Sequence, residues 1–418
     1  MTITAQHIEP AAVTPKPTVA SHARDYVARI RGGELGALPA VLGLVVLCVF
    51  FGVMRPVFFS AGNFANLFTQ GAAVAVIAMG MVFVLLLGEI DLSAGFASGV
   101  CAAVLAQVVA VHGYPWYVAV LAALATGVVI GLVLGFLVAK VGIPSFVVTL
   151  AAFLAFQGTV LLLIKGGTNV SIGDEVIIAI ENRNIPPALG WLLVVLIAGG
   201  YAAIQLLSVH RRTSRGLVTE PLPVVLARIG GLVAILAGAV YFLNLERSIN
   251  PALNSLKGVP IVVPIIAVLL IVWTFVLRRT AYGRHIYAVG GNREAARRAG
   301  INVDKIRISV FVICSFMAAI GGIILASKSR SVDPNTGGSN VLLYAVGAAV
   351  IGGTSLFGGK GRVLDAVLGG AVIAVIDNGM GLMNLSSGQK FVFTGSVLLL
   401  AAGVDALSRK RAAATGHR

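Results

Sequence analysis

Charged residues are scarce in this chain of 418 residues. Asp, Glu, Lys and Arg together make up 11% of it, whereas 58% of the residues are hydrophobic and the mean hydropathy is +0.97. Soluble domains carry about 25% charged residues, because their surfaces must be hydrated. The composition therefore excludes a soluble globular protein and predicts an integral membrane protein.

Acidic residues are the scarcer of the two charge signs, with 16 Asp and Glu against 31 Lys and Arg, a net charge of +15. In a soluble protein this excess would suggest a nucleic-acid partner. Here the basic residues fall in short clusters between apolar runs, as expected of loops on the cytoplasmic side of a membrane. We interpret them as topology signals, and we expect membrane lipid and no nucleic acid around the protein.

Cysteine and histidine are too few to indicate a metal site. Cys48, Cys101 and Cys314 lie inside apolar runs without paired spacing, and the six histidines are scattered. Neither a disulfide framework nor a metal site is therefore expected. The chain also lacks an H-E-x-x-H motif and a nucleophile placed beside a base, so we expect no catalytic residue.

A phosphate-binding loop is also lacking. The segment GGKGR, at 358–362, suggests one at first sight, but Thr354 stands where the first glycine belongs and Gly361 follows the lysine. The Walker pattern requires Gly at the first position and Ser or Thr at the second. We expect no bound cofactor. If the protein works in an ATP-driven system, a partner subunit must bind the nucleotide.

Hydrophobic segments fill the chain from residue 37 onward. Each is close to the roughly 20 residues that a membrane-spanning helix needs. The twelve candidates are 37–54, 69–88, 94–111, 117–139, 143–164, 190–209, 223–243, 259–277, 308–327, 341–357, 364–384 and 391–407. They predict an all-α polytopic membrane protein with 10 to 12 spans, some of them broken or re-entrant.

The basic loops set the orientation of these spans. With the N-terminus inside, the loops on the cytoplasmic side hold Lys140, then Arg211, Arg212 and Arg215, then the cluster 278–307, then Lys360 and Arg362, and finally Arg409, Lys410 and Arg411. An even number of spans then places both termini in the cytoplasm. We expect a disordered cytoplasmic tail over 1–34, a transmembrane domain over 35–408 and a cytoplasmic C-terminal tail over 409–418.

The loop 278–307 contains the sequence of a short helix. Asn292 can cap its N-terminus, Glu294 lies in the first turn, Arg297 lies in the last turn, and Gly300 is placed to end it. A helix of two turns is unstable alone and must lean on something. Two interpretations remain open: a solvated loop that only sets topology, or a knob that docks onto a cytoplasmic partner.

The segment GEIDLSAG, at 88–95, places two carboxylates next to an apolar span. Such groups are costly in lipid and often functional. Asp91 and Ser93 are also natural caps for the following helix, and a cytoplasmic helix end would hold both carboxylates in water. We favour capping for Asp91, and we expect Glu89 to pair with a basic group across the bundle.

A second interrupted segment, GGTSLFGGKGR at 352–362, carries Thr354 and Ser355 among its glycines. Paired glycine-interrupted segments in two halves of a chain are typical of transporters with broken helices near the pathway. Gln70, Gln157, Asn378 and Asn384 are further polar side chains in or beside spans. Each could contact a polyol, or equally form a hydrogen bond between helices.

Small residues recur every four positions in GVVIGLVLG. Gly127, Gly131 and Gly135 fall on one face of the same predicted helix. Small residues at this spacing let two helix backbones approach closely in a membrane. We therefore expect this face to pack against another helix.

Several stretches together resemble a known family, the sugar-class permease subunits of bacterial ABC importers, of the ribose and xylose type. They are GEIDLSAG (88–95), IPSFVVTLAAFLAFQG (143–158), TAYGRHIYAVGGNREAARRAGINVDKIR (280–307), VIGGTSLFGGKGRV (350–363) and IDNGMGLM (376–383). The chain looks most similar to the xylose type, in length and in an extra apolar stretch at about 190–255. It departs from that type at Leu342, Leu343 and Tyr344, where relatives carry Glu-Leu-Asp.

The resemblance implies that 290–300 is a coupling helix that docks into a groove on a separate ATPase. Glu294, Ala295, Ala296 and Gly300 stand at the positions of the family motif. It also implies a periplasmic sugar-binding protein, a pore formed by two permease chains, and a multi-pass location in the bacterial inner membrane. The expected substrate is D-xylose or a related pentose.

Two other classes of function fit the sequence less well. An ion-coupled secondary sugar transporter would use Glu89 and Asp91 to bind H⁺ or Na⁺. Such machines usually need several ionisable groups inside the bundle, and beyond these two and Asp377 the spans offer almost none. A membrane enzyme is disfavoured because no catalytic constellation is visible.

Overall fold

The computed structural model describes residues 36–164, 167–252 and 255–414, together with positions 18, 20, 21, 24 and 28. Most of the predicted tail 1–34 therefore lies outside the described residues. The helices are α2 (Leu38–Met54), α3 (Ala61–Leu86), α4 (Ala94–Ala106), α5 (Trp116–Phe136), α6 (Ser145–Leu163), α7 (Glu175–Asn182), α8 (Pro187–Thr213), α9 (Leu222–Leu243), α10 (Val262–Arg279), α11 (Ala281–Gly291), α12 (Arg293–Arg298), α13 (Val303–Ser329), α14 (Ser339–Ile351), α15 (Val363–Leu382) and α16 (Ser387–Ala414).

The predicted all-α class is confirmed, and each of the twelve hydrophobic segments overlaps one of the longer helices. In the described part of the chain, nine helices are long and apolar enough to cross a membrane: α3, α4 with the π-helical turn η2 (Gln107–Val111), α5 with η3 (Leu137–Val141), α6, α8, α9, α10, α13 and α15. Helices α2 and α14 are apolar but shorter. The count of twelve spans stays a prediction.

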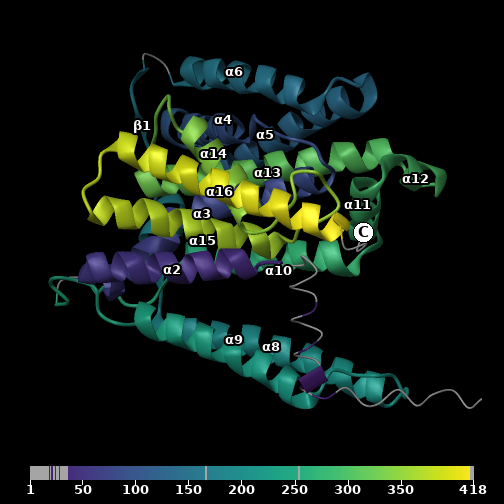
Figure 1. Ribbon diagram of the computed structural model, residues 1–418. Coiled ribbons are helices and arrows are strands. Elements are labelled where there is room, and N and C mark those ends of the chain that lie inside the picture. Colours follow the sequence, from purple (N-terminus) through teal and green to yellow (C-terminus); the bar gives the residue numbers. More distant parts are fainter. Residues whose placement is uncertain are drawn as a thin grey trace, which may run out of the picture.

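Helices α3, α13 and α15 run through the middle of the bundle (Figure 1). Every residue of α3 from Gly71 to Leu86 is buried, whereas α8, α9 and α10 expose many large apolar side chains. A helix that is apolar all round is stable only when it is enclosed by other helices or by lipid. The central helices therefore form the core, and the peripheral ones present the surface that lipid covers.

The glycine stripe of α5 packs directly on α13. A Cβ atom added to Gly131 would collide with the backbone of Val312, and one added to Gly135 would lie 2.8 Å from the Cα of Ile308. Lipid provides no hydrophobic force between helices, so such close backbone packing holds them together instead. The packing role predicted for the three glycines is confirmed.

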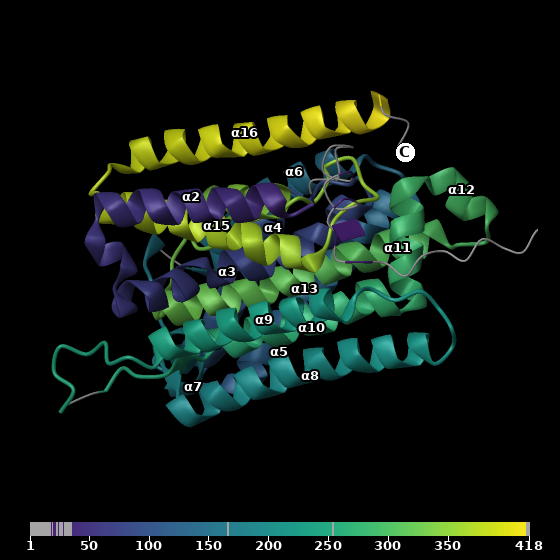
Figure 2. The ribbon, with the colours of Figure 1, turned by 60° about the horizontal axis from the view of Figure 1, so that its bottom comes forward.

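The two ends of the bundle differ. At one end lie α11 and α12, together with Gly36 beside Gly353 and the last turns of α16; we call this end the α12 face (Figure 2). At the other end, β1 (Val170–Ser171) pairs with β4 (Ser331–Val332), and β2 (Asn184–Ile185) pairs with β3 (Val259–Pro260). We call this end the sheet face.

Basic loops gather on the α12 face (Figure 2), and the placement of this face in the cytoplasm stays a prediction. Lys140 Nζ lies 2.9 Å from Asp304 Oδ2, which joins the loop after α5 to the start of α13. Glu175 and Glu181 belong to α7, at the sheet face. Helix α16 continues to Ala414, past the predicted end of its span.

Helices α8 and α9 form a hairpin along one edge of the bundle in both views (Figures 1 and 2). They belong to the extra apolar stretch noted in the sequence. A small apolar cluster at the sheet face joins them to α3, and it comprises Ala65, Val194, Val240, Leu243 and Val259. Arg228 of α9 forms an ion pair with Glu220 at 2.8 Å, in the loop that joins the two helices.

Candidate functional site

Helix α12 is the short helix predicted in the basic loop. Asn292 caps it, because its Oδ1 accepts the backbone N–H of Ala295 at 2.9 Å. At the other end Gly300 has φ +82°, and its N–H donates to the carbonyl of Arg297 while that of Ile301 donates to the carbonyl of Ala296. This pair of bonds is the Schellman motif, which satisfies the last helix carbonyls.

Nearly all of α12 is exposed. Ala296 is its buried residue, at 4% exposure, and the other residues of the helix are exposed. Figure 2 shows α12 beyond the ends of the long helices. Glu294 pairs with Arg298 at 3.1 Å and with Arg297 at 3.6 Å along the helix surface. Exposed pairs of this kind add at most about 0.5 kcal/mol. These surface pairs stabilise the helix little, and its exposed side is a surface that a partner could cover.

Glu89 connects α12 to the transmembrane bundle. Its Oε1 accepts hydrogen bonds from Arg293 Nη2 at 2.8 Å, and from Arg307 Nη2 at 2.7 Å and Nε at 3.0 Å. Arg293 is the first residue of α12 and Arg307 lies in the second turn of α13. We call these three residues the Glu89 fork. The expectation that Glu89 pairs with basic groups across the bundle is confirmed.

The expectation that water would surround both carboxylates is wrong. Glu89 is 5% exposed and Asp91 is fully buried. Helix α6 covers the segment, since Ser145 Oγ accepts the N–H of Ile90 and Thr149 Oγ1 donates to its carbonyl. The loop 352–362 covers it from another side.

Asp91 prepares the start of α4. Its Oδ1 accepts the backbone N–H of Ser93 at 2.9 Å and the Ser93 hydroxyl at 2.6 Å. Ser93 stands at the N-cap position, but its own side chain makes no capping bond there. The capping role therefore belongs to Asp91, through an Asx-type turn, and the role expected of Ser93 is corrected.

The two glycine-interrupted segments meet at the α12 face. The N–H of Gly359 donates to the carbonyl of Leu86 at 2.8 Å, and Tyr287 of α11 donates its hydroxyl proton to the carbonyl of Gly361, also at 2.8 Å. A Cβ at Gly290 would collide with the carbonyl oxygen of Leu86. Thr354 and Ser355 are buried within the loop, at 1% and 3% exposure. We call the place where the end of α3, the loop 352–362 and α11 meet the glycine junction.

Asn378 lies far from this junction, near the sheet-face end of α15. Asn378 and Asn63 of α3 exchange two amide hydrogen bonds, at 2.8 and 2.9 Å, and Asn378 also donates to Gln70 at 3.1 Å. Interhelical bonding, one of the two roles considered for these amides, is the one observed. Gln157 is exposed on α6 and lies apart from both clusters.

The three residues that replace the acidic pattern of xylose-type relatives lie on α14. Leu342 is buried against Gly95 of α4, and Leu343 is 56% exposed. Tyr344 is partly buried, on the side where Thr394 of α16 and Asp377 of α15 lie. Two of these positions therefore supply packing in place of charge.

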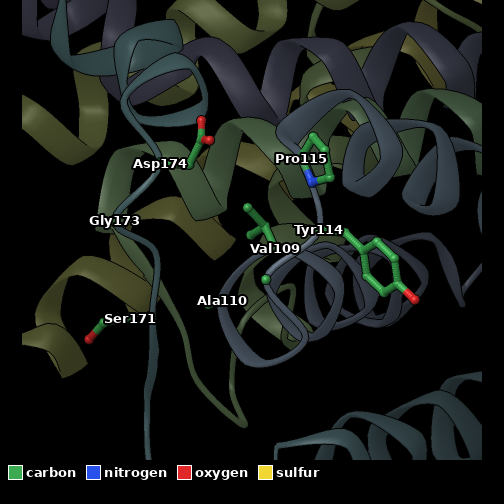
Figure 3. A pocket seen from close by; sticks show the side chains of 8 residues that line it. Val109, Ala110, Tyr114, Pro115, Ser171, Gly173 and Asp174 are labelled. Atoms are coloured by element: carbon green, nitrogen blue, oxygen red, sulfur yellow. The ribbon is translucent and has the colours of Figure 1, made fainter.

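A pocket of about 500 Å³ opens on the sheet face, between η2 and the loop that leads into α7. Tyr114, Ser171 and Asp174 contribute its polar groups, but Figure 3 shows them spread around the rim and not converging on one point. Asp174 is also engaged, because its Oδ1 accepts the backbone N–H groups that begin α7. Nowhere in the described residues do three His, Cys, Asp or Glu side chains gather to hold a metal ion.

Arg293 and Arg307 are the functional residues that the sequence analysis missed. Both lie in the basic loop, but they are 204 and 218 residues away from Glu89 in the chain. The available signal was Glu89, because a carboxylate that becomes buried must be paired with a cation.

Comparison with known proteins fixes the family. Residues 63–402 match the family described as the permease component of the branched-chain amino acid transport system. The chain belongs to this permease family. It is a membrane transport subunit of the bacterial inner membrane and not an enzyme.

Curated relatives place the permease among sugar transporters of this family. It is 36% identical to the xylose transport system permease protein XylH of Escherichia coli K12, over 89% of this chain and 92% of the relative. It is 34% identical to XylH of Haemophilus influenzae, over 92% and 99%. It is 31% identical to the ribose import permease protein RbsC of Escherichia coli K12, over 88% and 92%. No solved structure matches the chain.

Proposed function

We propose that the protein is the permease subunit of an ATP-driven importer for D-xylose or a related pentose. The similarity to XylH over nearly the whole of both chains supports this substrate class. The α12 face would lie in the cytoplasm, since most of the basic loops gather there. The sheet face would then receive sugar from a periplasmic binding protein, and two permease chains would form the pathway.

The observation that carries the proposal is the attachment of an exposed α12 to the bundle through the Glu89 fork. An ATPase that binds α12 would displace Arg293, whose Nη2 lies 2.8 Å from Glu89 Oε1. Glu89 lies between α3 and α4 and is also held by Arg307 of α13. A movement of α12 would therefore be passed to α3, α4 and α13 at once.

The glycine junction lies beside this fork and gives the same movement a second route. Loop 352–362 joins α14 to α15, and its backbone is bonded to Leu86 and to Tyr287 of α11. Movement of α11 with α12 would shift the loop relative to α3. Both interrupted segments would thus respond to the ATPase, while ATP itself stays on the partner subunit.

The ion-coupled alternative fits the geometry poorly. Glu89 is held by two guanidinium groups, and Asp91 is engaged at the start of α4. A carboxylate that binds and releases ions must exchange partners easily, whereas these two hold structural elements together. Sugar uptake into vesicles with all subunits and an ionophore should therefore persist as long as ATP is present, and loss of uptake would favour the symporter.

Substitutions in α12 test the coupling role. Gly300→Val places a β-branched residue at φ +82°, at a cost of about 1 kcal/mol or more. Glu294→Lys places a cation in the first turn, where the helix dipole disfavours it. Both variants should reach the membrane in normal amounts but lose ATPase co-purification and sugar-stimulated ATP hydrolysis. Lys305→Gln, at an exposed position outside α12, is the matched control and should retain both.

The outcome that contradicts this role is equally clear. If Gly300→Val and Glu294→Lys associate with the ATPase and support hydrolysis like the control, α12 is only a solvated topology loop.

A further inference from the structure

A cavity of about 540 Å³ lies on the α12 face, beside the glycine junction. It opens where α10 ends, between α11 and the loop that leads into α15. Backbone of Gly353, Gly359 and Gly361 forms part of its wall, so a ligand can approach the main chain there without meeting side chains. None of the roles proposed so far uses this cavity.

The lining of the cavity is strongly basic. Arg278, Lys360 and Arg362 contribute three cations, and Asp365 is the carboxylate among the lining residues. Asp365 is occupied, because Oδ1 accepts Arg362 Nε at 3.0 Å and Nη2 at 2.8 Å, while Oδ2 accepts the Arg362 backbone N–H at 2.8 Å. The Arg362 charge is therefore largely neutralised inside the protein.

The other two cations remain available to a ligand. In the described part of the chain, no carboxylate forms a salt bridge with Arg278 or Lys360. Tyr287 also lines the cavity, and burial raises the pKa of its phenol, so it stays protonated and donates to Gly361. The described lining thus carries two uncompensated positive charges around a hollow, which suits a phosphate group.

Helix α10 shows where this phosphate would come from. Val268, Ile271, Val272 and Phe275 are 59%, 54%, 46% and 61% exposed. Their spacing of three and four residues forms one apolar stripe along the helix, and the stripe leads to Arg278 one turn further on. An acyl chain that lies on this stripe would place its headgroup at the mouth of the cavity.

We propose that the cavity beside the glycine junction binds the phosphate of an anionic phospholipid in the cytoplasmic leaflet. Basic pockets between helices on this side of a membrane are suited to anionic headgroups. The inference rests on the proposed function in one respect, because it takes the α12 face as the cytoplasmic one. Free phosphate shares the chemistry of the headgroup, but it would gain nothing from the apolar stripe of α10.

Lipid titration of the full-length chain in detergent tests the site, with bound lipid counted by native mass spectrometry. Phosphatidylglycerol should bind more tightly than phosphatidylcholine. The double variant Arg278→Gln and Lys360→Gln should weaken phosphatidylglycerol binding about twenty-five-fold, since each basic residue near an anionic headgroup contributes about five-fold. Arg279→Gln is the matched control, because Arg279 is the exposed neighbour of Arg278 but does not line the cavity. It should leave phosphatidylglycerol binding nearly unchanged.

Three outcomes would overturn the proposal. Equal binding of the two lipids would show that no phosphate site selects the anionic headgroup. Equal losses in the double variant and in a control doubled by Arg284→Gln, another exposed cation outside the cavity, would show only general surface attraction. If inorganic phosphate titrated by calorimetry binds as tightly as phosphatidylglycerol, the site serves a soluble ligand.

Failure here is distinguishable from failure of the proposed function. Lipid binding is measured without the ATPase or sugar, so its loss leaves the coupling test on α12 unaffected. Conversely, loss of ATP-driven uptake in the wild-type complex would remove the transport proposal while the lipid count stayed as measured. All substituted cations in this test are exposed, so the variants should fold.

Discussion

Replacing Glu89 with Gln removes the charge at the centre of the Glu89 fork, and its cost follows from the burial of the three side chains. The Glu89 side chain is 6% exposed, that of Arg307 is 16% exposed and that of Arg293 is 44% exposed. Breaking a buried ion pair by removing one partner costs about 3 to 5 kcal/mol. A pair with one well-hydrated partner contributes about 1 kcal/mol or less.

The ion pair between Glu89 and Arg307 therefore accounts for most of the lost stability. Gln keeps a carbonyl oxygen that can still accept one of the bonds to Arg307, so we expect Glu89→Gln to cost about 2 to 3 kcal/mol, below the full range for a broken buried pair. Arg307→Gln should cost about as much, because it leaves the Glu89 carboxylate with Arg293 as its remaining partner. Arg293→Gln should cost about 1 kcal/mol or less, yet it removes the contact through which α12 acts.

A double-mutant cycle measures the interaction between Glu89 and Arg307 directly. Unfolding of the permease by titrated denaturing detergent gives the free energies for Glu89→Gln, Arg307→Gln and the double variant, and the coupling should be about 2 kcal/mol. Sugar-stimulated ATP hydrolysis in nanodiscs should fall for Arg293→Gln although its stability is nearly normal. A coupling below about 0.5 kcal/mol, or full stimulation in Arg293→Gln, would refute the reasoning.

Three further predictions concern single positions. Asp91→Asn should lower membrane abundance and sugar uptake less than Glu89→Gln does, because Asn can still accept the bonds at the start of α4; equal and complete loss of uptake at normal abundance would contradict this. Gly131→Ala should lower thermal stability by the 1 to 3 kcal/mol typical of overpacking, since its Cβ would collide with α13, whereas Gly158→Ala meets nothing within 4 Å and should be neutral. Burial raises the pKa of Glu181 to about 8, so the folded protein holds a proton that the unfolded chain releases near pH 4.5. The free energy of unfolding therefore falls as the pH rises between these two values. Melting temperatures at pH 6 and 9 should show this fall in the wild type but not in Glu181→Gln.

Local features of the site were predictable in detail. The cap at Asn292 and the stop at Gly300 depend on residues within one turn of each helix end, and a sequence displays these directly. The close packing of Gly127, Gly131 and Gly135 follows in the same way from their spacing. Each of these features is encoded within about ten residues, so no knowledge of the tertiary arrangement was needed.

Features that depend on distant segments were predicted only in part. The need of Glu89 for a cation was foreseen, but its burial was not, because the covering residues come from α6 and from the loop 352–362. Helix α11 was taken as part of a loop, although Thr280 caps it by accepting the N–H of Gly283 at 3.1 Å. Its eleven residues include two large aliphatic ones, Ile286 and Val289, and their burial against the bundle stabilises the helix.

The long chain separation within the Glu89 fork has a consequence for biogenesis. Glu89 is synthesised more than 200 residues before Arg293 and Arg307. During translation the carboxylate therefore waits through the insertion of α5, α6 and the α8–α9 hairpin before its partners emerge. A chain that stops short of α12 leaves Glu89 without either cation, and one that stops short of α13 leaves it with Arg293 alone. The Glu89 fork that holds α12 is thus complete only once the start of α13 has been made.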